Sequence, residues 1–244
     1  MKRDSFKEYE VLLGQLGEWK AGLQERWPKV RRRAAPTARR ITLLALKYSA
    51  ALVLPFFVLV GGSVFLYGNY GVPTWPALLI GVLLTTLILL VYAAWIARKL
   101  TGTTRVSRRV AKVTLAVVVA YSLYALIYLS SLNVKDTGIR SYYRSLHPLL
   151  RVAVSTFILV DSDLIITDMK REPHDYAKMG LPVSINSMHY AQEDGYVHAI
   201  DLRTIGRGRL RNWLVAGYFR AMGFRTLRHV GTADHLHVSL PPPS

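Results

Sequence analysis

Long uncharged stretches alternate with short charged ones through the middle of this 244-residue chain. Three apolar runs, residues 48–68, 77–97 and 113–133, each offer about the ~20 residues that a helix needs to cross ~30 Å of hydrocarbon. The buried helices of a soluble bundle rarely stay uncharged on every face for so long. The pattern therefore predicts three transmembrane helices.

Charged residues orient these spans. The loop 98–112 carries six basic residues and no acidic residue, whereas the loop 69–76 carries no charge. Basic loops stay on the cytoplasmic side of a membrane. The N-terminus and the 98–112 loop are therefore predicted to be cytoplasmic, and the segment after the third span extracytoplasmic. We expect a basic cytoplasmic segment 1–40, a membrane region 41–133 and an extracytoplasmic domain 134–244.

The net charge of +17 comes mostly from the first half of the chain, and such a charge suggests a negatively charged binding partner. Apolar residues recur there at helical spacing, three or four residues apart. They are Phe6, Tyr9, Leu13, Leu16, Trp19, Leu23 and Trp27. Beside a membrane span, such an amphipathic helix favours contact with anionic lipid over a partner helix, and no specific nucleic acid is expected. The absence of cysteine excludes a disulfide scaffold and a thiol nucleophile.

The sequence of the C-terminal domain predicts a small α+β fold with an antiparallel sheet. Alternating or β-branched residues indicate strands at 152–160, 163–169, 183–189, 196–202, 225–230 and 235–240. A helix is predicted within 206–223, ending at a glycine. Its apolar face is expected to contain Leu210, Trp213, Leu214, Phe219 and Met222.

Histidines are concentrated in this domain, since all seven follow the last span. His235 and His237 alternate on one strand and so face the same side, an arrangement that by itself is typical of half-exposed strand residues. His189 and Asp201 lie on two strands that a polar connection joins. A third strand carrying His237 can bring His, Asp and His to one point, with a fourth zinc position left for water. Asp234 is then the candidate general base.

The stretches SMH, HAID and DHLHV resemble the zinc peptidase superfamily of D-Ala-D-Ala carboxypeptidases, phage L-alanyl-D-glutamate endopeptidases and the hedgehog signalling domain. The resemblance covers residues 163–240. Ser187 and His189 match the SxH motif of that family, and Ala199 and Asp201 match its AxD motif. His237 matches the third zinc ligand.

The resemblance also implies roles around the metal. Asp234 matches the late catalytic acid, and His235 matches a histidine that sits beside the metal-bound water in relatives with an HxH motif. Arg171 resembles an arginine that contacts the substrate carboxylate, and Ser187 is placed with it on the substrate side. The predicted set is therefore Asp234 and His235 for catalysis, Arg171 and Ser187 for substrate, and His189, Asp201 and His237 for zinc.

One spacing departs from the family pattern, because eleven residues separate His189 from Asp201 and the usual interval is shorter. A symmetric hairpin would place His189 opposite His198. Either the hairpin tip is extended, which a longer polar connection tolerates, or His198 replaces a ligand. We favour the extended tip because the AxD motif is intact.

The other histidines have structural interpretations. His147 precedes a proline and is expected at a turn or a helix end. His174 lies in a polar stretch, and His229 is expected to support the site from behind its ligands.

Together these features predict a zinc-dependent peptidoglycan peptidase, either a murein endopeptidase or a D,D-carboxypeptidase. It would be anchored in a bacterial cytoplasmic membrane with its domain in the periplasm. Host cell and bacteriophage remain open as the source, as does self-association in the membrane. One alternative is a non-catalytic zinc-binding structural or interaction protein, such as a phage virion or pore component. A three-span channel with an accessory domain is a third.

Overall fold

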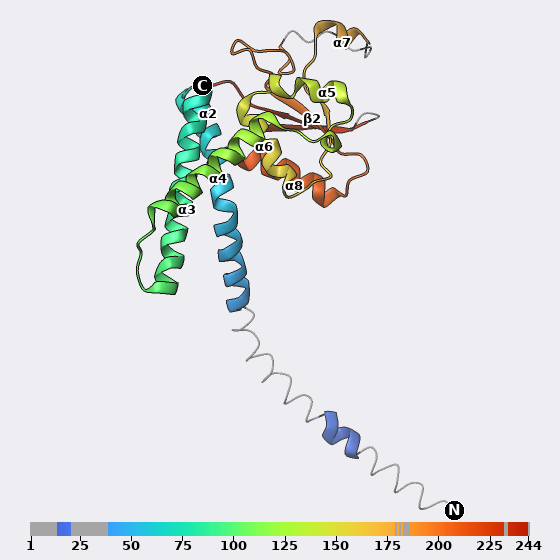
Figure 1. Ribbon diagram of the computed structural model, residues 1–244. Helices are drawn as coiled ribbons and strands as arrows, with labels where there is room; N and C mark the ends of the chain where they lie inside the picture. The colour runs from blue at the N-terminus through green and yellow to red at the C-terminus, as the bar shows by residue number, and fades with distance from the viewer. Residues whose placement is uncertain are drawn as a thin grey trace, which may run out of the picture. The chain divides into compact units, whose positions relative to one another are not determined.

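The computed structural model describes residues 14–20, 39–178, 180, 182, 186–231 and 234–243 (Figure 1). The chain divides into two compact units, Met1–Val53 and Leu54–Ser244. Residues 14–20 are helical and exposed. The remainder of the predicted amphipathic helix, residues 6–13 and 21–27, lies outside the described residues.

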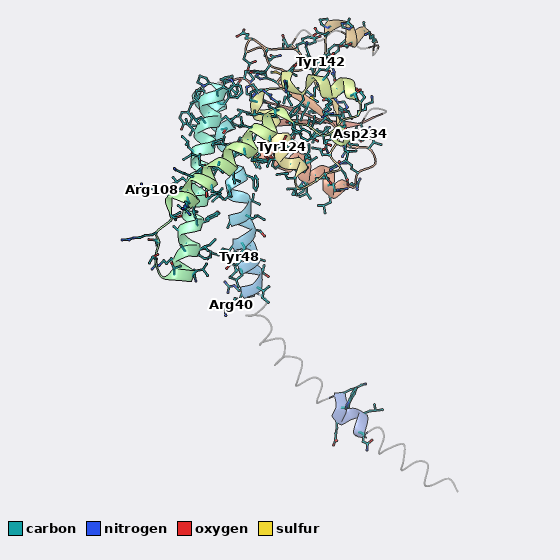
Figure 2. All side chains as sticks on the ribbon, viewed as in Figure 1. Arg40, Tyr48, Arg108, Tyr124, Tyr142 and Asp234 are labelled. Atoms are coloured by element: carbon teal, nitrogen blue, oxygen red, sulfur yellow. The ribbon has the colours of Figure 1, made fainter. Side chains whose placement is uncertain are left out.

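Three helices are long and apolar enough to cross a membrane, as the hydrophobic runs predict. They are Arg39–Tyr70, α3 (Thr74–Thr101) and α4 (Arg108–Ile127). The first contains a π-helical turn, η1 (Val58–Gly62), and continues as α2 (Ser63–Tyr70). Basic residues lie at the end of α4 that is remote from the sheet domain, where Figure 2 labels Arg108.

The third helix is shorter than predicted. It ends at Ile127 rather than at residue 133, because Tyr128 adopts an extended backbone. The side-chain amide of Asn133 donates hydrogen bonds to the backbone carbonyls of Ser162 and Leu164, at 2.8 and 2.9 Å. These bonds attach the end of the apolar run to the C-terminal domain, so its last residues do not continue the helix.

Small and hydroxylated residues bring the first and second spans together. The Ser63 hydroxyl donates to the Leu59 carbonyl at 2.6 Å, and Gly81 of α3 lies directly against this pair. The Thr85 hydroxyl donates to the Pro55 carbonyl at 3.2 Å. Close packing of small residues and hydroxyl bonds of this kind are typical of helix pairs in membranes.

The C-terminal domain contains a four-stranded antiparallel sheet, which confirms the predicted class. Its order is β1 (Ile166–Asp168), β2 (Ala199–Arg203), β4 (His235–Ser239) and β3 (Arg225–His229). Helices α6 (Pro148–Ile158) and α8 (Arg209–Ala221) pack under one face, while α5 (Thr137–Ser141) and α7 (Pro173–Lys178) lie on the other side (Figure 1). Two short 3-10 turns, η2 (Ser131–Asn133) and η3 (Tyr142–Ser145), connect α4 to α6.

Two of the predicted strands are wrong in the described residues. Residues 152–158 belong to α6, which begins after His147 because the ring of His147 accepts a hydrogen bond from the Leu149 amide and Pro148 occupies the first turn. Almost every residue of α6 is buried, so its pattern lacks the polar face that marks a helix. Of the predicted strand 183–189, residues 186–189 form turns and the remainder lies outside the described residues.

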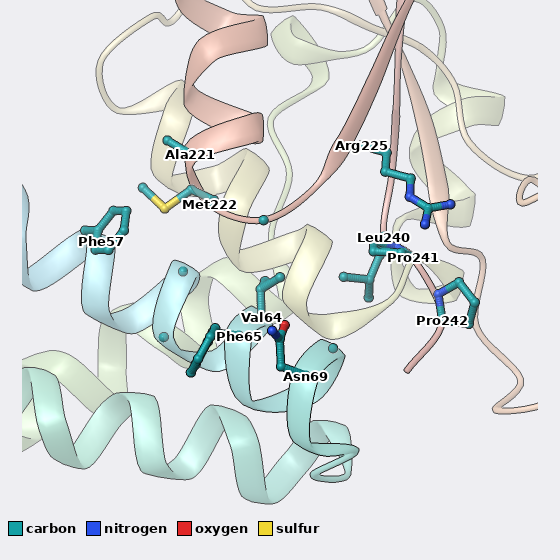
Figure 3. Close-up of a pocket in the computed structure, with 14 residues that line it drawn as sticks. Phe57, Val64, Phe65, Asn69, Ala221, Met222, Arg225, Leu240, Pro241 and Pro242 are labelled. Atoms are coloured by element: carbon teal, nitrogen blue, oxygen red, sulfur yellow. The ribbon is translucent and has the colours of Figure 1, made fainter. Parts of the chain in front are cut away.

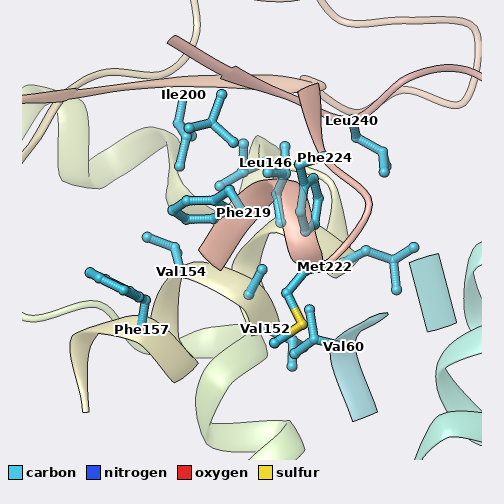
Figure 4. Packing of buried hydrophobic residues seen from close by; sticks show 14 of the residues in the cluster. Val60, Leu146, Val152, Val154, Phe157, Ile200, Phe219, Met222, Phe224 and Leu240 are labelled. Atoms are coloured by element: carbon cyan, nitrogen blue, oxygen red, sulfur yellow. The ribbon is translucent and has the colours of Figure 1, made fainter. Parts of the chain in front are cut away.

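The helix predicted near residues 206–223 is present as α8, but its predicted apolar face is divided. Phe219 and Met222 are buried in the core, where Phe219 meets Ile200 of the sheet and residues of α6 (Figure 4). Trp213 and Leu210 point the other way and are 68% and 69% exposed. The two sets lie on opposite sides of the same helix.

The domain is docked directly on the membrane helices through α6. The Tyr143 hydroxyl donates to the Ala125 carbonyl of α4 at 2.5 Å, and the buried Arg151 donates to the Leu126 carbonyl at 2.6 Å. The Thr74 hydroxyl at the start of α3 contacts the His147 ring at 2.9 Å.

A groove of about 530 Å³ follows the edge of this junction (Figure 3). Phe57 and Phe65 line one side, and Met222, Arg225 and Pro242 line the other. None of the residues predicted for catalysis, substrate or zinc lines it.

Candidate metal centre

Three elements bring the predicted ligands to one point. Asp201 of β2 and His237 of β4 are paired directly across the two strands, and His189 follows α7 in a turn. Ile200 and Leu236, their neighbours in sequence, are buried in the core. Because strand side chains alternate, Asp201 and His237 therefore lie on the sheet face that is turned away from α6 and α8.

The ligand atoms form a compact triangle. His189 Nε2 lies 3.2 Å from His237 Nδ1 and 3.3 Å from Asp201 Oδ1, and the last two atoms are 2.9 Å apart. Two ligand atoms about 2.0–2.1 Å from a zinc ion, at a tetrahedral angle, are roughly 3.3–3.4 Å apart. The three ligand atoms are therefore close enough together to hold one metal ion, and two of the three separations are near the tetrahedral value.

A backbone carbonyl orients the first ligand. His189 Nδ1 lies 2.6 Å from the Met169 carbonyl, so this nitrogen carries the proton and donates it. The lone pair of Nε2 is then directed at the triangle, as in the outer partners that fix ligating imidazoles in metal sites. The Ser187 hydroxyl accepts hydrogen bonds from the His189 amide and from the Tyr176 hydroxyl, at 3.3 and 2.6 Å. In this structure Ser187 thus supports the turn that holds His189.

The second ligand is held ionised. Burial opposes the charged form of Asp201, but the adjacent imidazoles of His189 and His237 and the charge of Arg171 outweigh it. They hold the pKa of the Asp201 carboxyl well below its usual range. An ionised carboxylate is the form that binds a metal.

Arg171, the predicted substrate arginine, lies against this ligand. Its guanidinium donates to Asp201 Oδ2 at 2.5 Å and to Asp168 Oδ2 at 2.6 Å. Burial alone would lower the pKa of Arg171, but the two carboxylates raise it. The charge is therefore fixed beside the triangle, where it is paired with the two carboxylates.

Two further histidines extend the cluster along the strands. His235 Nε2 lies 3.7 Å from Asp201 Oδ2. The ring of His229, opposite His235 in the register, stacks on it with centroids 4.7 Å apart, and it lies 6.3 Å from the ring of His237. Burial and the neighbouring charge of His235 lower the pKa of His229. His229 is exposed beside His235, and its supporting role stays a prediction.

Asp234, the predicted general base, is engaged elsewhere. Its carboxylate accepts hydrogen bonds from the Thr204 hydroxyl at 2.6 Å and from two nitrogens of Arg228, at 3.1 and 2.7 Å. These bonds, the Arg228 pair first, lower the pKa of Asp234 to about 2. Asp234 is labelled in Figure 2.

A second group, His147, Asp194 and His198, has a different character. Asp194 Oδ2 lies 2.9 Å from His198 Nε2 and 3.5 Å from His147 Nε2. Because His147 Nδ1 accepts the Leu149 amide, its Nε2 carries the proton and acts as a donor to Thr74 or Asp194. A protonated nitrogen is not a metal ligand, so this group is better explained as a hydrogen-bonded junction with the membrane helices.

This second group also answers the question of His198. The hairpin is close to symmetric, since Ala191 pairs with Val197 and the His198 amide donates to the Met188 carbonyl. The ring of His198 nevertheless bonds Asp194, and Asp201 is the residue that reaches His189. The ligand set with Asp201 is therefore the one that the structure brings together.

Other contacts of the site carried no sequence signal. The Met169 carbonyl is a backbone group, and Arg228 and Asp194 are surface charges of a common kind. The remaining histidine, His174, is exposed in α7 beside Asp175.

The fold and the site define a protein with three candidate membrane spans and a small α+β domain. The domain contains two clusters of His and Asp side chains, and of these His189, Asp201 and His237 form the candidate metal centre. Comparison with known protein families, with curated proteins and with solved structures finds no significant match.

Proposed function

We propose that the chain is a membrane-anchored zinc amide hydrolase that acts on the peptides of peptidoglycan. The observation that carries this proposal is the convergence of His189, Asp201 and His237 on the face of the sheet turned away from α6 and α8. When bound there, zinc would supply a water of lowered pKa and polarise the scissile carbonyl. A set of three protein ligands favours such a catalytic site over a closed structural one.

Two residues are proposed to move the proton. His235 is next to the triangle and can exchange a proton with a nucleophile or leaving group in that space. Asp234 is proposed from the motif, and its carboxylate would first have to leave Arg228, because a pKa of about 2 makes it a poor proton acceptor near neutral pH. Neutralising Arg228 should therefore increase any contribution of Asp234.

Arg171 and Ser187 are proposed on the substrate side. The guanidinium of Arg171 provides a fixed positive charge beside the triangle, suited to a peptide carboxylate or to negative charge that develops on the carbonyl oxygen. Both murein endopeptidases and D,D-carboxypeptidases handle peptides with free carboxylates. The domain follows the third span directly, so the wall layer next to the membrane is the substrate within reach.

A second candidate is a zinc-binding structural or interaction protein without catalysis. The engagement of Asp234 by Thr204 and Arg228 favours it, since the motif's acid is then not available to a substrate. Zinc would still hold the strands and the turn of His189 together.

The test is digestion of purified peptidoglycan by the full chain in detergent, with release of peptide fragments followed by mass. We expect release that a chelator abolishes and that His237→Ala eliminates. His174→Ala, an exposed histidine outside the triangle, serves as the matched control and should retain activity. Zinc binding without any fragment release would establish the structural alternative, and release that survives His237→Ala would refute the proposed centre.

A further inference from the structure

Helix α8 has a second apolar face that the domain core does not use. Asn212, Val215 and Phe219 face the core, whereas the opposite side of the helix is exposed. Exposed apolar side chains are also found just after α6 and just before α8. These two segments lie close together, because Arg207 and Arg211 bind Asp161. We call this set the outer apolar patch: Leu159, Val160, Ile205, Leu210, Trp213 and Leu214.

The contacts of α6 fix the level of this patch relative to the membrane helices. The Tyr121 hydroxyl of α4 lies 2.7 Å from the Thr156 hydroxyl of α6. Tyr121 precedes the domain-side end of the span, Ile127, by six residues, which is about 9 Å along a helix. The C-terminal half of α6 therefore lies at the depth of the apolar span and not above it. Its sequence suits this position, since α6 is itself an apolar helix.

Helix α8 is held at the same level. The Tyr218 hydroxyl donates to the Ala153 carbonyl at 2.9 Å, and the Tyr218 ring packs 4.9 Å from that of Phe157. Figure 1 shows α6 between α4 and α8. The apolar face of α8 thus continues laterally from a segment that is already at membrane depth.

The chemistry of the patch matches a lipid leaflet. Trp213 belongs to the patch and is 68% exposed, and tryptophan concentrates at the boundary between hydrocarbon and headgroups. Arg209 and Arg220 are exposed on one flank of the helix, beside Trp213, at positions suited to lipid phosphates. A helix with an apolar face and arginines beside it is the pattern of interfacial membrane helices.

We propose that the outer apolar patch is immersed in the lipid leaflet on the domain side of the membrane. The domain then rests on the bilayer through α8, in addition to its attachment to the three spans. Asp201 and His237 lie on the opposite face of the sheet, so this contact directs the metal centre away from the lipid. The inference depends on the membrane spans but not on zinc or on peptide hydrolysis.

The absence of cysteine allows a direct test with the full chain. Single variants Trp213→Cys and Leu210→Cys would carry a nitroxide spin label in vesicles of phosphatidylcholine and phosphatidylglycerol. Leu227→Cys is the matched control, because Leu227 is an equally apolar, exposed residue on the open face of the sheet. Paramagnetic relaxation would compare collision with oxygen, which concentrates in hydrocarbon, and with a water-soluble nickel chelate.

We expect the labels at 210 and 213 to collide mainly with oxygen, and the label at 227 mainly with the nickel chelate. All three side chains are exposed, so these replacements leave the core intact. A label at 213 as accessible to nickel as the label at 227 would overturn the proposal. Protection of the 213 label from both reagents would overturn it as well, because a second copy or another protein would then cover the patch.

Discussion

Acidification should destabilise the junction between the domain and the membrane helices through a single buried histidine. His147 is fully buried at the start of α6, and its ring contacts Thr74, Asp194 and His198. Burial lowers the pKa of His147 to about 3, and the charge of His198 adds to this effect while Asp194 opposes it. Tyr67, Tyr196 and Arg151 also surround the ring, and of these only Arg151 carries a charge near neutral pH.

The direction and size of this loss of stability follow from the difference in the pKa of His147 between the folded and unfolded states. The pKa of His147 in the folded chain is below the value of about 6.5 for an unfolded histidine, so the unfolded state binds more protons between these two values. The stability is fully present above about pH 6.5 and is lost as the pH falls toward 3. At about pH 5 the loss from this one group is about 2 kcal/mol. For a chain of this size, that corresponds to a fall of about 4–8 °C in the unfolding midpoint.

The assay is thermal unfolding of the full chain in detergent micelles at neutral pH and at about pH 5, with chelator present at both so that metal loss does not contribute. His147→Asn is the control, because asparagine also caps a helix but does not titrate. We expect the midpoint of the parent chain to fall by about 4–8 °C more than that of the variant. Equal falls in the two proteins would refute the assignment of the acid sensitivity to His147.

Two substitutions test other parts of the fold by the same unfolding assay at neutral pH. Gly81→Ala should destabilise the chain by about 1–3 kcal/mol, because the new Cβ would lie 2.2 Å from the Ser63 hydroxyl. Gly62→Ala, which meets nothing closer than 3.9 Å, is its control, and an equal loss in both would contradict the close helix contact. Asp161→Asn should cost about 3–5 kcal/mol, since it leaves the buried charge of Arg207 without its carboxylate. A neutral effect would show that this pair does not hold the start of α8.

The membrane part of the fold could be predicted because hydrophobic length alone determines a span. The ends could not: α4 stops at Ile127, and Asn133 bonds carbonyls about thirty residues further along the chain, partners that the local pattern does not reveal. Strands β3 and β4 could also be predicted from local sequence, because each alternates or is rich in β-branched residues. In α6 the pattern failed, because a helix buried on all sides looks like a buried strand.

The local sequence also could not show which face of α8 is buried. Leu210, Trp213 and Phe219 are equally apolar, and the helical period alone could not show that the core takes one side and leaves the other exposed. The ligands His189, Asp201 and His237 could be proposed because their motifs are local. The engagement of Asp234 by Arg228 could not, since it depends on how β3 pairs with β4.

The metal centre carries the proposed function, and the metal content of the purified chain is its direct test. Full chain purified with zinc and dialysed would be analysed for bound metal, beside His237→Ala and His147→Ala. We predict stoichiometric zinc in the parent chain, its loss in His237→Ala and its retention in His147→Ala, because the junction group is not a ligand set. Zinc that survives His237→Ala, or that disappears only in His147→Ala, would contradict the assignment of His189, Asp201 and His237 as the site.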